Sequence, residues 1–196
     1  KRLHGCPREA AATAPREAFS ASGVSAFYRR AALEEVGLLD EHFESYYEDI
    51  ELGWRLQWRG WRCVFAPKSI VYHHLSSSYA PTGWRQHFNS ARNAEVVWWS
   101  HMSPRMRWRY LHVHLFCVAL QGLAEMRRGR FRPWLSGKVD ALRPHWRRRI
   151  REKRRQNERL ARRGDAAMLD RVERDWMKVH IGPRLRKAMG WMRRAR

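Results

Sequence analysis

The stretch LDEHFESYYEDIELGWRLQWRGWRCVFAPKSIVYHH, residues Leu39–His74, decides how the rest of this chain is interpreted. It places acids where a helix is predicted to begin and imidazoles where a predicted strand ends: Glu48, Asp49, Glu51, His73 and His74. Carboxylates and imidazoles are the side chains that a metal-assisted group transfer needs. The stretch is therefore the first place to look for chemistry.

Each of these residues has a functional and a structural interpretation. Asp49 at a helix start can take a proton from an incoming hydroxyl, as a general base, or the acids can serve only to complement the helix dipole. His73 can ligate a divalent cation or be a hydrogen-bonded structural residue. One imidazole with a carboxylate favours manganese, and magnesium with oxygen ligands and water is the alternative.

The tryptophans near the stretch also have two interpretations. Trp54, Trp58, Trp61 and Trp84 suit a core or its rim, because large aromatic side chains contribute most of their free energy by burial. Trp84 stands apart, since it follows a Ser-rich loop and is the best candidate to stack on a sugar ring.

Periodicity and turn residues predict the elements around these residues. Tyr46, Ile50, Trp54 and Trp58 recur every fourth position, which predicts one helix over residues 46–59, ended by Gly60. We expect residues 1–20 to be a connecting loop. The other predicted elements are strands at Ser22–Tyr28, Trp61–Ala66 and Ser69–His73, and helices at Arg30–Val36, Trp84–Trp99 and Pro104–Arg128.

The charge is divided unevenly along the chain. Residues 1–100 carry 12 Lys or Arg and 11 Asp or Glu, whereas residues 101–196 carry 28 and 8, so the net charge of +21 is almost all in the second half. Such a region is expected to meet polyanions. Within it, residues 147–163 offer only Ile150, Leu160 and Ala161 for burial, which predicts a solvated helix or a flexible arm.

The predicted helix after Ser103-Pro104 has an apolar core at Leu111–Leu123 that includes two histidines and a glutamine. This core is too short and too polar to span a bilayer. The helix either packs on the first half of the chain or lies in a membrane interface.

The cysteine content and the first residues indicate the cellular compartment. Cys6, Cys63 and Cys117 are odd in number and widely spaced, which favours a reducing compartment over a disulfide framework or a zinc site. The first twenty residues hold no apolar run, so no signal peptide is expected. The chain also lacks an initiator Met, and we expect it to be a fragment.

Ordered motifs in residues 20–100 are similar to a known family. SGVSAFYRR at residues 22–30, VGLLDE at 36–41, YEDIEL at 47–52, Gly60-Trp61, Pro67 and VYHH at 71–74 occur in the order and at the spacing seen there. They resemble the acceptor-side half of the inverting, rhamnosyltransferase-like glycosyltransferases of the large family two. The resemblance implies an α/β fold class: the C-terminal part of a GT-A, or nucleotide-diphospho-sugar transferase, fold with short strands, followed by basic α-helices.

The same resemblance implies site roles. Asp49 corresponds to the catalytic base and His73 to a ligand of the divalent metal, Mn²⁺ or Mg²⁺. Glu48 corresponds to an acceptor-binding residue, and we assign Glu51 and Trp84 to the acceptor as well. Arg92, in an Arg-Asn pair on the next helix, is expected at the nucleotide diphosphate.

Two departures from the family pattern matter. Glu51 stands where the family usually has Asp. The chain contains no Asp-x-Asp motif, so the nucleotide-binding half is expected to precede Lys1, and the isolated chain is expected to be inactive. We divide the chain into a connecting loop (1–20), the acceptor-side half of a transferase domain (21–100) and a basic helical region (101–196).

The expected function is transfer of a sugar from a nucleotide-sugar donor to a glycan or polyprenyl-linked acceptor, with inversion. The basic region is expected to contact an anionic membrane surface, which places the protein in the cytoplasm, peripheral at the inner face of the membrane. The alternative is a non-enzymatic basic module that binds nucleic acid or anionic membrane. Nucleic acid is the less expected partner, because it does not explain the Glu-Asp and His-His pairs.

Overall fold

The computed structural model of the chain describes residues 14–72 and 83–172. The elements run in the order β1 (Arg16–Ala18), α2 (Arg30–Val36), a 3₁₀ turn (Glu41–Phe43), α3 (Glu48–Arg59), β2 (Cys63–Phe65), α4 (Trp84–His101), α5 (Pro104–Arg127), α6 (Phe131–Asp140), α7 (Pro144–Leu160) and α8 (Asp165–Arg171). The described part is thus mainly helical with one small sheet, which is compatible with a piece of an α/β transferase fold.

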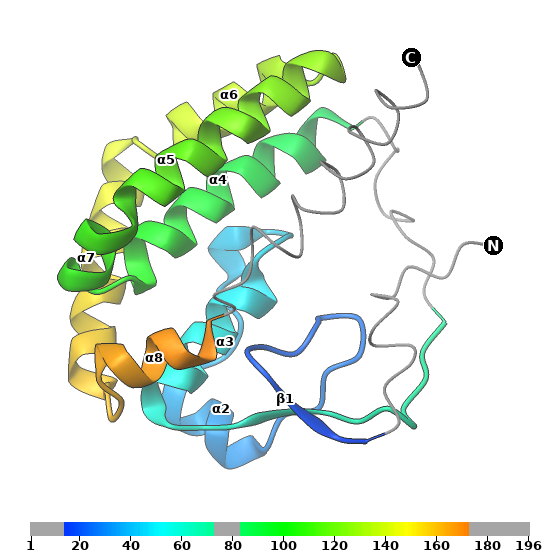
Figure 1. Cartoon of the computed structure of the whole chain (residues 1–196), viewed down its shortest axis with the longest axis vertical. Helices are drawn as coiled ribbons and strands as arrows, with labels where there is room; N and C mark the ends of the chain where they lie inside the picture. Colours follow the sequence, from blue (N-terminus) through cyan, green and yellow to red (C-terminus); the bar gives the residue numbers. More distant parts are fainter. Residues whose placement is uncertain (1–13, 73–82, 173–196) are drawn as a thin grey trace, which may run out of the picture.

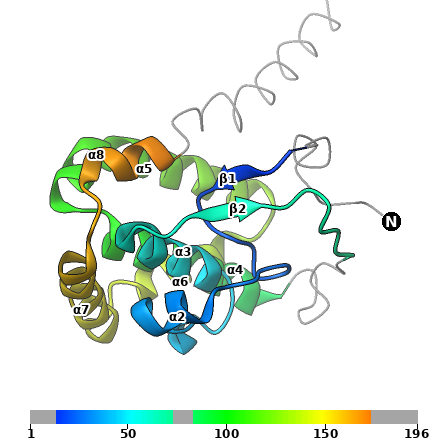
Figure 2. The same ribbon diagram turned by 90° about the horizontal axis from the view of Figure 1, so that it is seen from below.

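The helices form one packed group (Figure 1). α6 lies along α4, α5 lies against α6, and α7 packs on both α4 and α3. The two-stranded sheet lies away from α7 (Figure 2). It is antiparallel, with Glu17 opposite Val64.

Two apolar clusters hold these elements together. The larger one joins the turn before α3 to helices α4, α6 and α7 through Phe43, Val96, Val97, Ala141, Trp146 and Ile150. The smaller one joins Trp58 of α3 to Met106 of α5 and Met168 of α8. Trp54 packs against both clusters. The basic region is therefore folded onto the first half of the chain.

The predicted helices are confirmed, and their ends follow the expected stop and start residues. Gly37 and Gly60 end α2 and α3 at positive φ, 86° and 101°. The Ser103 side chain accepts a hydrogen bond from the Met106 N–H at the start of α5. Glycine at positive φ and a serine cap are ordinary helix boundaries.

Two strand predictions are wrong in the described residues. Ser22–Tyr28 forms a turn, with the Ser25 N–H bonded to the Ser22 carbonyl, and its Gly23 N–H is bonded to Asp49. β1 lies instead at Arg16–Ala18, within the predicted loop of residues 1–20. Residues 69–72 also form no strand, because Ser69 closes a turn onto the Ala66 carbonyl.

The sequence predicts a solvated helix or a flexible arm at residues 147–163, and the helix is confirmed: they are helical up to Leu160, within α7 (Pro144–Leu160), and most of them are exposed. The helix buries one stripe of side chains at helical spacing: Trp146, Ile150, Lys153 and Asn157. Half of that stripe is polar, so hydrophobic periodicity did not reveal it.

Candidate active site

The backbone just before α3 is held in an unusual conformation. Glu44, Tyr46 and Tyr47 all have positive φ, 58°, 68° and 71°. Such conformations cost free energy for residues with a side chain and concentrate at functional sites. The turn leads directly into Glu48 and Asp49.

Asn93 of α4 fixes this turn. Its Nδ2 donates to the carbonyls of Phe43, Ser45 and Tyr46 at 2.9, 2.9 and 2.8 Å. The side chain is fully buried. One amide group, with two hydrogens shared among three main-chain acceptors, thus stabilises the strained path.

Asp49 faces the Ser22–Tyr28 turn. Its Oδ2 accepts from the Gly23 N–H at 2.8 Å, and its Oδ1 accepts from the Ile50 N–H at 2.8 Å. A Cβ at Gly23 would lie 3.7 Å from Asp49 Oδ2 and 3.8 Å from Glu48 Oε1. The glycine therefore lies directly against both acids.

Glu48 has an unsatisfied oxygen. Its Oε2 is buried and has no hydrogen-bond partner within the described residues. Burial raises the pKa of Glu48, and the neighbouring Asp49 charge acts in the same direction against the lowering effect of the Glu48 backbone N–H. A buried acceptor without a donor is costly, which makes Glu48 a candidate to receive a hydroxyl from outside the chain.

A broad pocket of about 890 Å³ lies beside this region. Ser22, Ser25 and Tyr28, from the turn that carries Gly23, are among its lining residues. Burial raises the pKa of Tyr28, and the Asp49 charge adds to the effect, so Tyr28 and Asp49 are close enough to interact. The space is large enough for a sugar-sized ligand.

Glu51 does not fit the predicted acceptor-binding role. Its side chain has no exposed surface and bonds to three other buried groups. Arg55 Nη2 lies 2.7 Å, Lys153 Nζ 2.6 Å and His101 Nε2 3.2 Å from its carboxylate. Burial acts to raise the pKa of Glu51, but His101, Lys153 and Arg55 outweigh it and hold the pKa well below its usual range. Glu51 is a structural ion-pair residue here.

The geometry identifies the protonated nitrogen of His101. Asn157 Nδ2 lies 2.9 Å from Nδ1, and since the amide is a donor, Nδ1 accepts. Nε2 then carries the hydrogen that faces Glu51. Burial lowers the pKa of His101 despite the nearby carboxylate, which agrees with a neutral ring.

Arg92 does not fit the predicted diphosphate-binding role either. It is 5% exposed and lies over the Trp146 ring, with 4.9 Å from its guanidinium carbon to the ring centre. Glu44 and Asp140 lie 3.8 and 3.9 Å away. Its charge is used within the fold, because burial leaves no face for a phosphate.

Two predictions remain: Trp84 as a stacking residue and His73 as a metal ligand. Trp84 is 54% exposed at the first position of α4, where its ring is available to a ligand. His73 and His74 lie outside the described residues. Among residues 14–72 and 83–172, no three His, Cys, Asp or Glu side chains gather as a metal site would require.

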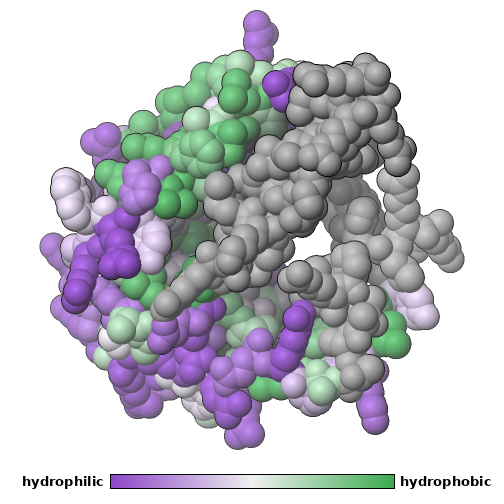
Figure 3. Space-filling model, in the orientation of Figure 1, coloured by the Kyte–Doolittle hydropathy of each residue, from purple (hydrophilic) through white to green (hydrophobic). Residues whose placement is uncertain are grey.

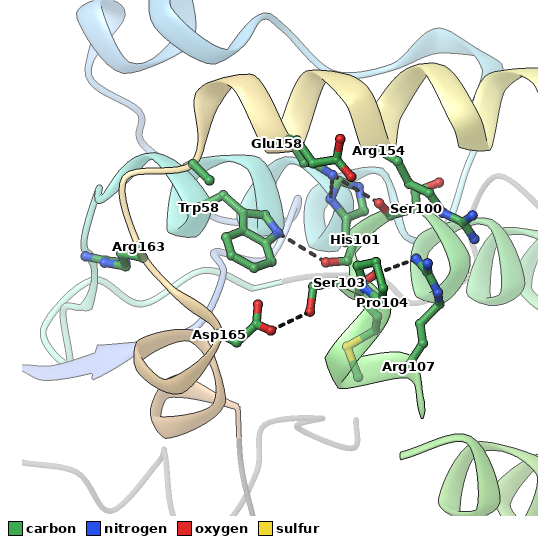
Figure 4. Close-up of a pocket in the computed structure, with 13 residues that line it drawn as sticks. Trp58, Ser100, His101, Ser103, Pro104, Arg107, Arg154, Glu158, Arg163 and Asp165 are labelled. Atoms are coloured by element: carbon green, nitrogen blue, oxygen red, sulfur yellow. Dashed lines mark hydrogen bonds between the residues drawn. The ribbon is translucent and has the colours of Figure 1, made fainter. Parts of the chain in front are cut away.

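A separate pocket of about 270 Å³ lies between α3, the α4–α5 junction, α7 and α8 (Figure 4). Trp58 Nε1 donates to the His101 carbonyl across it, and the Ser103 hydroxyl donates to Asp165. Arg107, which also lines it, donates to the Met102 carbonyl. Glu48 and Asp49 line neither this pocket nor the broad one, but only the broad pocket is lined by residues of the turn that contacts Asp49.

Sequence reasoning missed Lys153 and gave Asn93 no defined role. Lys153 lies in an Arg-rich run that resembles a solvated face, and only its helical spacing from Trp146 and Ile150 would have marked it. Asn93 was visible as part of the Arg-Asn pair, and a buried asparagine in a helix is itself a sign of a specific hydrogen-bonding task.

Comparison with known proteins adds direct evidence. Two proteins named N-acetylglucosaminyl-diphospho-decaprenol L-rhamnosyltransferase, from Mycobacterium tuberculosis strains CDC 1551 / Oshkosh and ATCC 25618 / H37Rv, are each 42% identical to this chain over 57 residues. The match covers 29% of this chain and 19% of each relative. No solved structure matches the chain significantly. A family model described as glycosyl transferase family group 2 matches residues 8–136, and because this is well over half of the chain, the chain belongs to that glycosyltransferase family.

Proposed function

We propose that the protein transfers a sugar from a nucleotide sugar to a hydroxyl of a glycan or lipid-linked acceptor, with inversion at the anomeric carbon. Asp49 is the general base of this proposal. The arrangement that carries it is the bond from the Gly23 N–H to Asp49 Oδ2, which fixes a carboxylate at a helix start against the Ser22–Tyr28 turn. Ser22, Ser25 and Tyr28 of that turn line the broad pocket. The names of the mycobacterial relatives agree with this substrate class.

In the proposed step, Asp49 accepts the proton of the acceptor hydroxyl. The oxygen then forms a bond to the anomeric carbon while the bond from that carbon to the diphosphate oxygen breaks. Attack from the side opposite the leaving group inverts the configuration. General base catalysis of this kind contributes about 10²- to 10⁴-fold to a rate.

Two neighbours complete the proposed acceptor side. Glu48 offers its unsatisfied Oε2 to a second hydroxyl of the acceptor. Trp84 offers an exposed ring for stacking on a sugar face. Glu51 and Arg92 are left out of the ligand contacts, because both are buried among partners of the chain itself.

A divalent cation, Mn²⁺ or Mg²⁺, remains a prediction that rests on His73. The described residues form no complete ligand set, so no step of the proposal passes through the cation. A bound cation would offset negative charge on the departing diphosphate.

The wider setting is also proposed. In this proposal the described fold is the C-terminal part of a GT-A domain, followed by basic helices. The donor is bound mainly by residues outside this chain. The protein acts in the cytoplasm, at the inner face of a membrane. The isolated chain is expected to show little or no transfer. Nucleic acid is a poor fit, because several basic side chains of the second half, such as Arg149 and Lys153, are bonded within the fold.

The test is Asp49→Asn in the full-length protein, measured as sugar transfer and as donor binding. Transfer should fall by about 10²-fold or more with little change in donor affinity. Glu34→Gln, at an exposed acid of α2, is the control and should keep the normal rate. A near-normal rate for Asp49→Asn would remove Asp49 as the base.

A further inference from the structure

Helix α5 has little protein around it. Of its residues Pro104–Arg127, only Met106 and Gly122 are buried. Its middle, Tyr110–Ala124, contains no Asp, Glu, Lys or Arg. A helix that is apolar over such a length is normally covered. In the described structure α5 lies against α6, contacts α4 where His114 stacks on Trp98, and packs near its start on α3 and α8 through Met106.

The uncovered side carries large apolar side chains in one stripe. Trp108 is 84%, Leu115 56%, Phe116 49%, Leu123 51% and Met126 49% exposed. With about 100° of rotation per residue, these five positions fall within roughly 100° of one another around the helix axis. Figure 3 shows hydrophobic surface gathered over α5, on the face turned to the viewer. An exposed apolar stripe of this size marks an interaction surface.

Both ends of the stripe are basic. Arg105 and Arg109 are exposed at its start, and Arg127 and Arg128 are exposed at its end. A stretch of apolar residues with cations at both ends suits a helix that lies parallel to an anionic surface. The uncharged middle measures roughly 22 Å at 1.5 Å per residue, shorter than the roughly 30 Å hydrocarbon core of a bilayer. Within the described residues, no helix is long and apolar enough to cross a membrane.

The charges around the α5 stripe decide which kind of partner can cover it. A second copy of the chain would bring arginines against arginines on a protein of net charge +21, which opposes association. Nucleic acid would engage the arginines but leave the apolar stripe in water. Of these three, a surface with anions above an apolar layer is the one that matches both features.

We propose that α5 lies in the interface of an anionic lipid bilayer, with the stripe Trp108, Leu115, Phe116, Leu123 and Met126 toward the acyl chains. The inference deepens the proposed function and rests on it only for the lipid-linked acceptor. α6 connects α5 to α4, and Asn93 of α4 holds the turn before Asp49. The membrane surface and the candidate site therefore belong to one packed group of helices.

The experiment is flotation of the full-length protein with vesicles, without any nucleotide sugar. Vesicles of phosphatidylcholine with about 30% phosphatidylglycerol should bind the protein, and pure phosphatidylcholine should bind it weakly. The double variant Leu115→Glu/Phe116→Glu should lower binding to anionic vesicles about tenfold or more, because it places two charges within the stripe.

The matched control is Leu38→Glu/Leu39→Glu. These neighbouring leucines are 72% and 50% exposed outside α5, and their substitution changes the net charge by the same amount. The control should bind like the unsubstituted protein, and circular dichroism should show that both variants are folded.

Three outcomes overturn the proposal: equal binding losses in both double variants, no loss in the α5 variant, or no binding of the unsubstituted protein to anionic vesicles. Self-association that the α5 variant abolishes, without vesicle binding, would assign the stripe to a second copy. Transfer to a water-soluble acceptor is measured separately, so failure of vesicle binding leaves Asp49 as base untouched.

Discussion

Lys153 Nζ lies 2.6 Å from Glu51 Oε1, which joins α7 to α3 between residues 102 positions apart. Lys153 Nζ also lies 2.8 Å from Asp40 Oδ2. One lysine from the basic region thus bridges two acids of the first half, which Arg149 and Arg55 also pair with. The acid Glu51 lies two positions after the proposed base, so the basic region helps to fix the helix that carries the site.

We expect Lys153→Met to lower the free energy of unfolding by about 3 kcal/mol, because it leaves Glu51 and Asp40 buried with fewer cations. Urea unfolding followed by circular dichroism measures this. Arg151→Met, at an exposed position of the same helix, should stay within about 0.5 kcal/mol of the unsubstituted protein. Equal effects of the two substitutions would contradict the role of Lys153.

We expect Asn93→Ala to impair the site more than the fold. Losing the amide removes the hydrogen bonds that Asn93 makes to the carbonyls of Phe43, Ser45 and Tyr46, which should cost about 1 to 3 kcal/mol. The turn before Asp49 should then shift, and transfer by the folded full-length protein should fall about 10- to 100-fold.

The control for this prediction is Asn157→Ala, which removes a buried amide that bonds to the Ser100 carbonyl and to His101. It should lower stability by a similar amount while transfer by the folded fraction stays near normal. If both variants lose transfer in proportion to stability alone, Asn93 has no positioning role.

The sequence allowed the helices α2 to α5 to be predicted because each ends or begins at a residue with a specific backbone preference, such as Gly37, Gly60 or Ser103. It also allowed Glu48 and Asp49 to be placed in the first turn of α3. These features depend on neighbours within a few positions.

The features that could not be predicted depend on distant partners. Glu51 and Arg92 have the residue types of ligand-binding groups, but Lys153 and Trp146 cover them from α7. The predicted strand at Ser22–Tyr28 failed because the Gly23 N–H is bonded to a side chain 26 positions away. None of these long-range contacts leaves a pattern in the neighbouring sequence.

We expect acid to weaken the fold through Asp40. Burial alone would raise its pKa, but the bonds from Arg149 and Lys153 outweigh it and lower the pKa from 3.8 to about 2. A lowered pKa in the folded state stabilises the fold above the unfolded value of 3.8, and this contribution disappears as the pH falls to about 2.

The measurement is urea unfolding from pH 6 to pH 2 for the unsubstituted protein and Asp40→Asn. The contribution of Asp40 at pH 6 should be about 1 to 2 kcal/mol. The stability of Asp40→Asn should therefore fall less steeply below pH 4. Parallel curves for the two proteins would show that Asp40 is not responsible.

We expect Gly137→Ala to loosen the contact between α6 and α4. A Cβ there would clash with the Phe88 carbonyl oxygen, a backbone atom that cannot move aside without shifting α4. Overpacking of this kind costs about 1 to 3 kcal/mol. Ser136→Ala, at the preceding position of α6, is the control and should leave the melting temperature nearly unchanged.

We expect Glu48→Gln to stabilise the fold and impair transfer together. Because burial and the Asp49 charge raise the pKa of Glu48, its ionised carboxylate destabilises the folded state at pH 7, and the neutral amide removes this penalty. The melting temperature at pH 7 should rise, and the gain should vanish at acid pH, where Glu48 is protonated in both states.

The proposed acceptor site loses a charged hydroxyl partner in the same variant, so KM for the acceptor should increase. A variant that is less stable at pH 7, or that has an unchanged KM, would remove Glu48 from the proposed site.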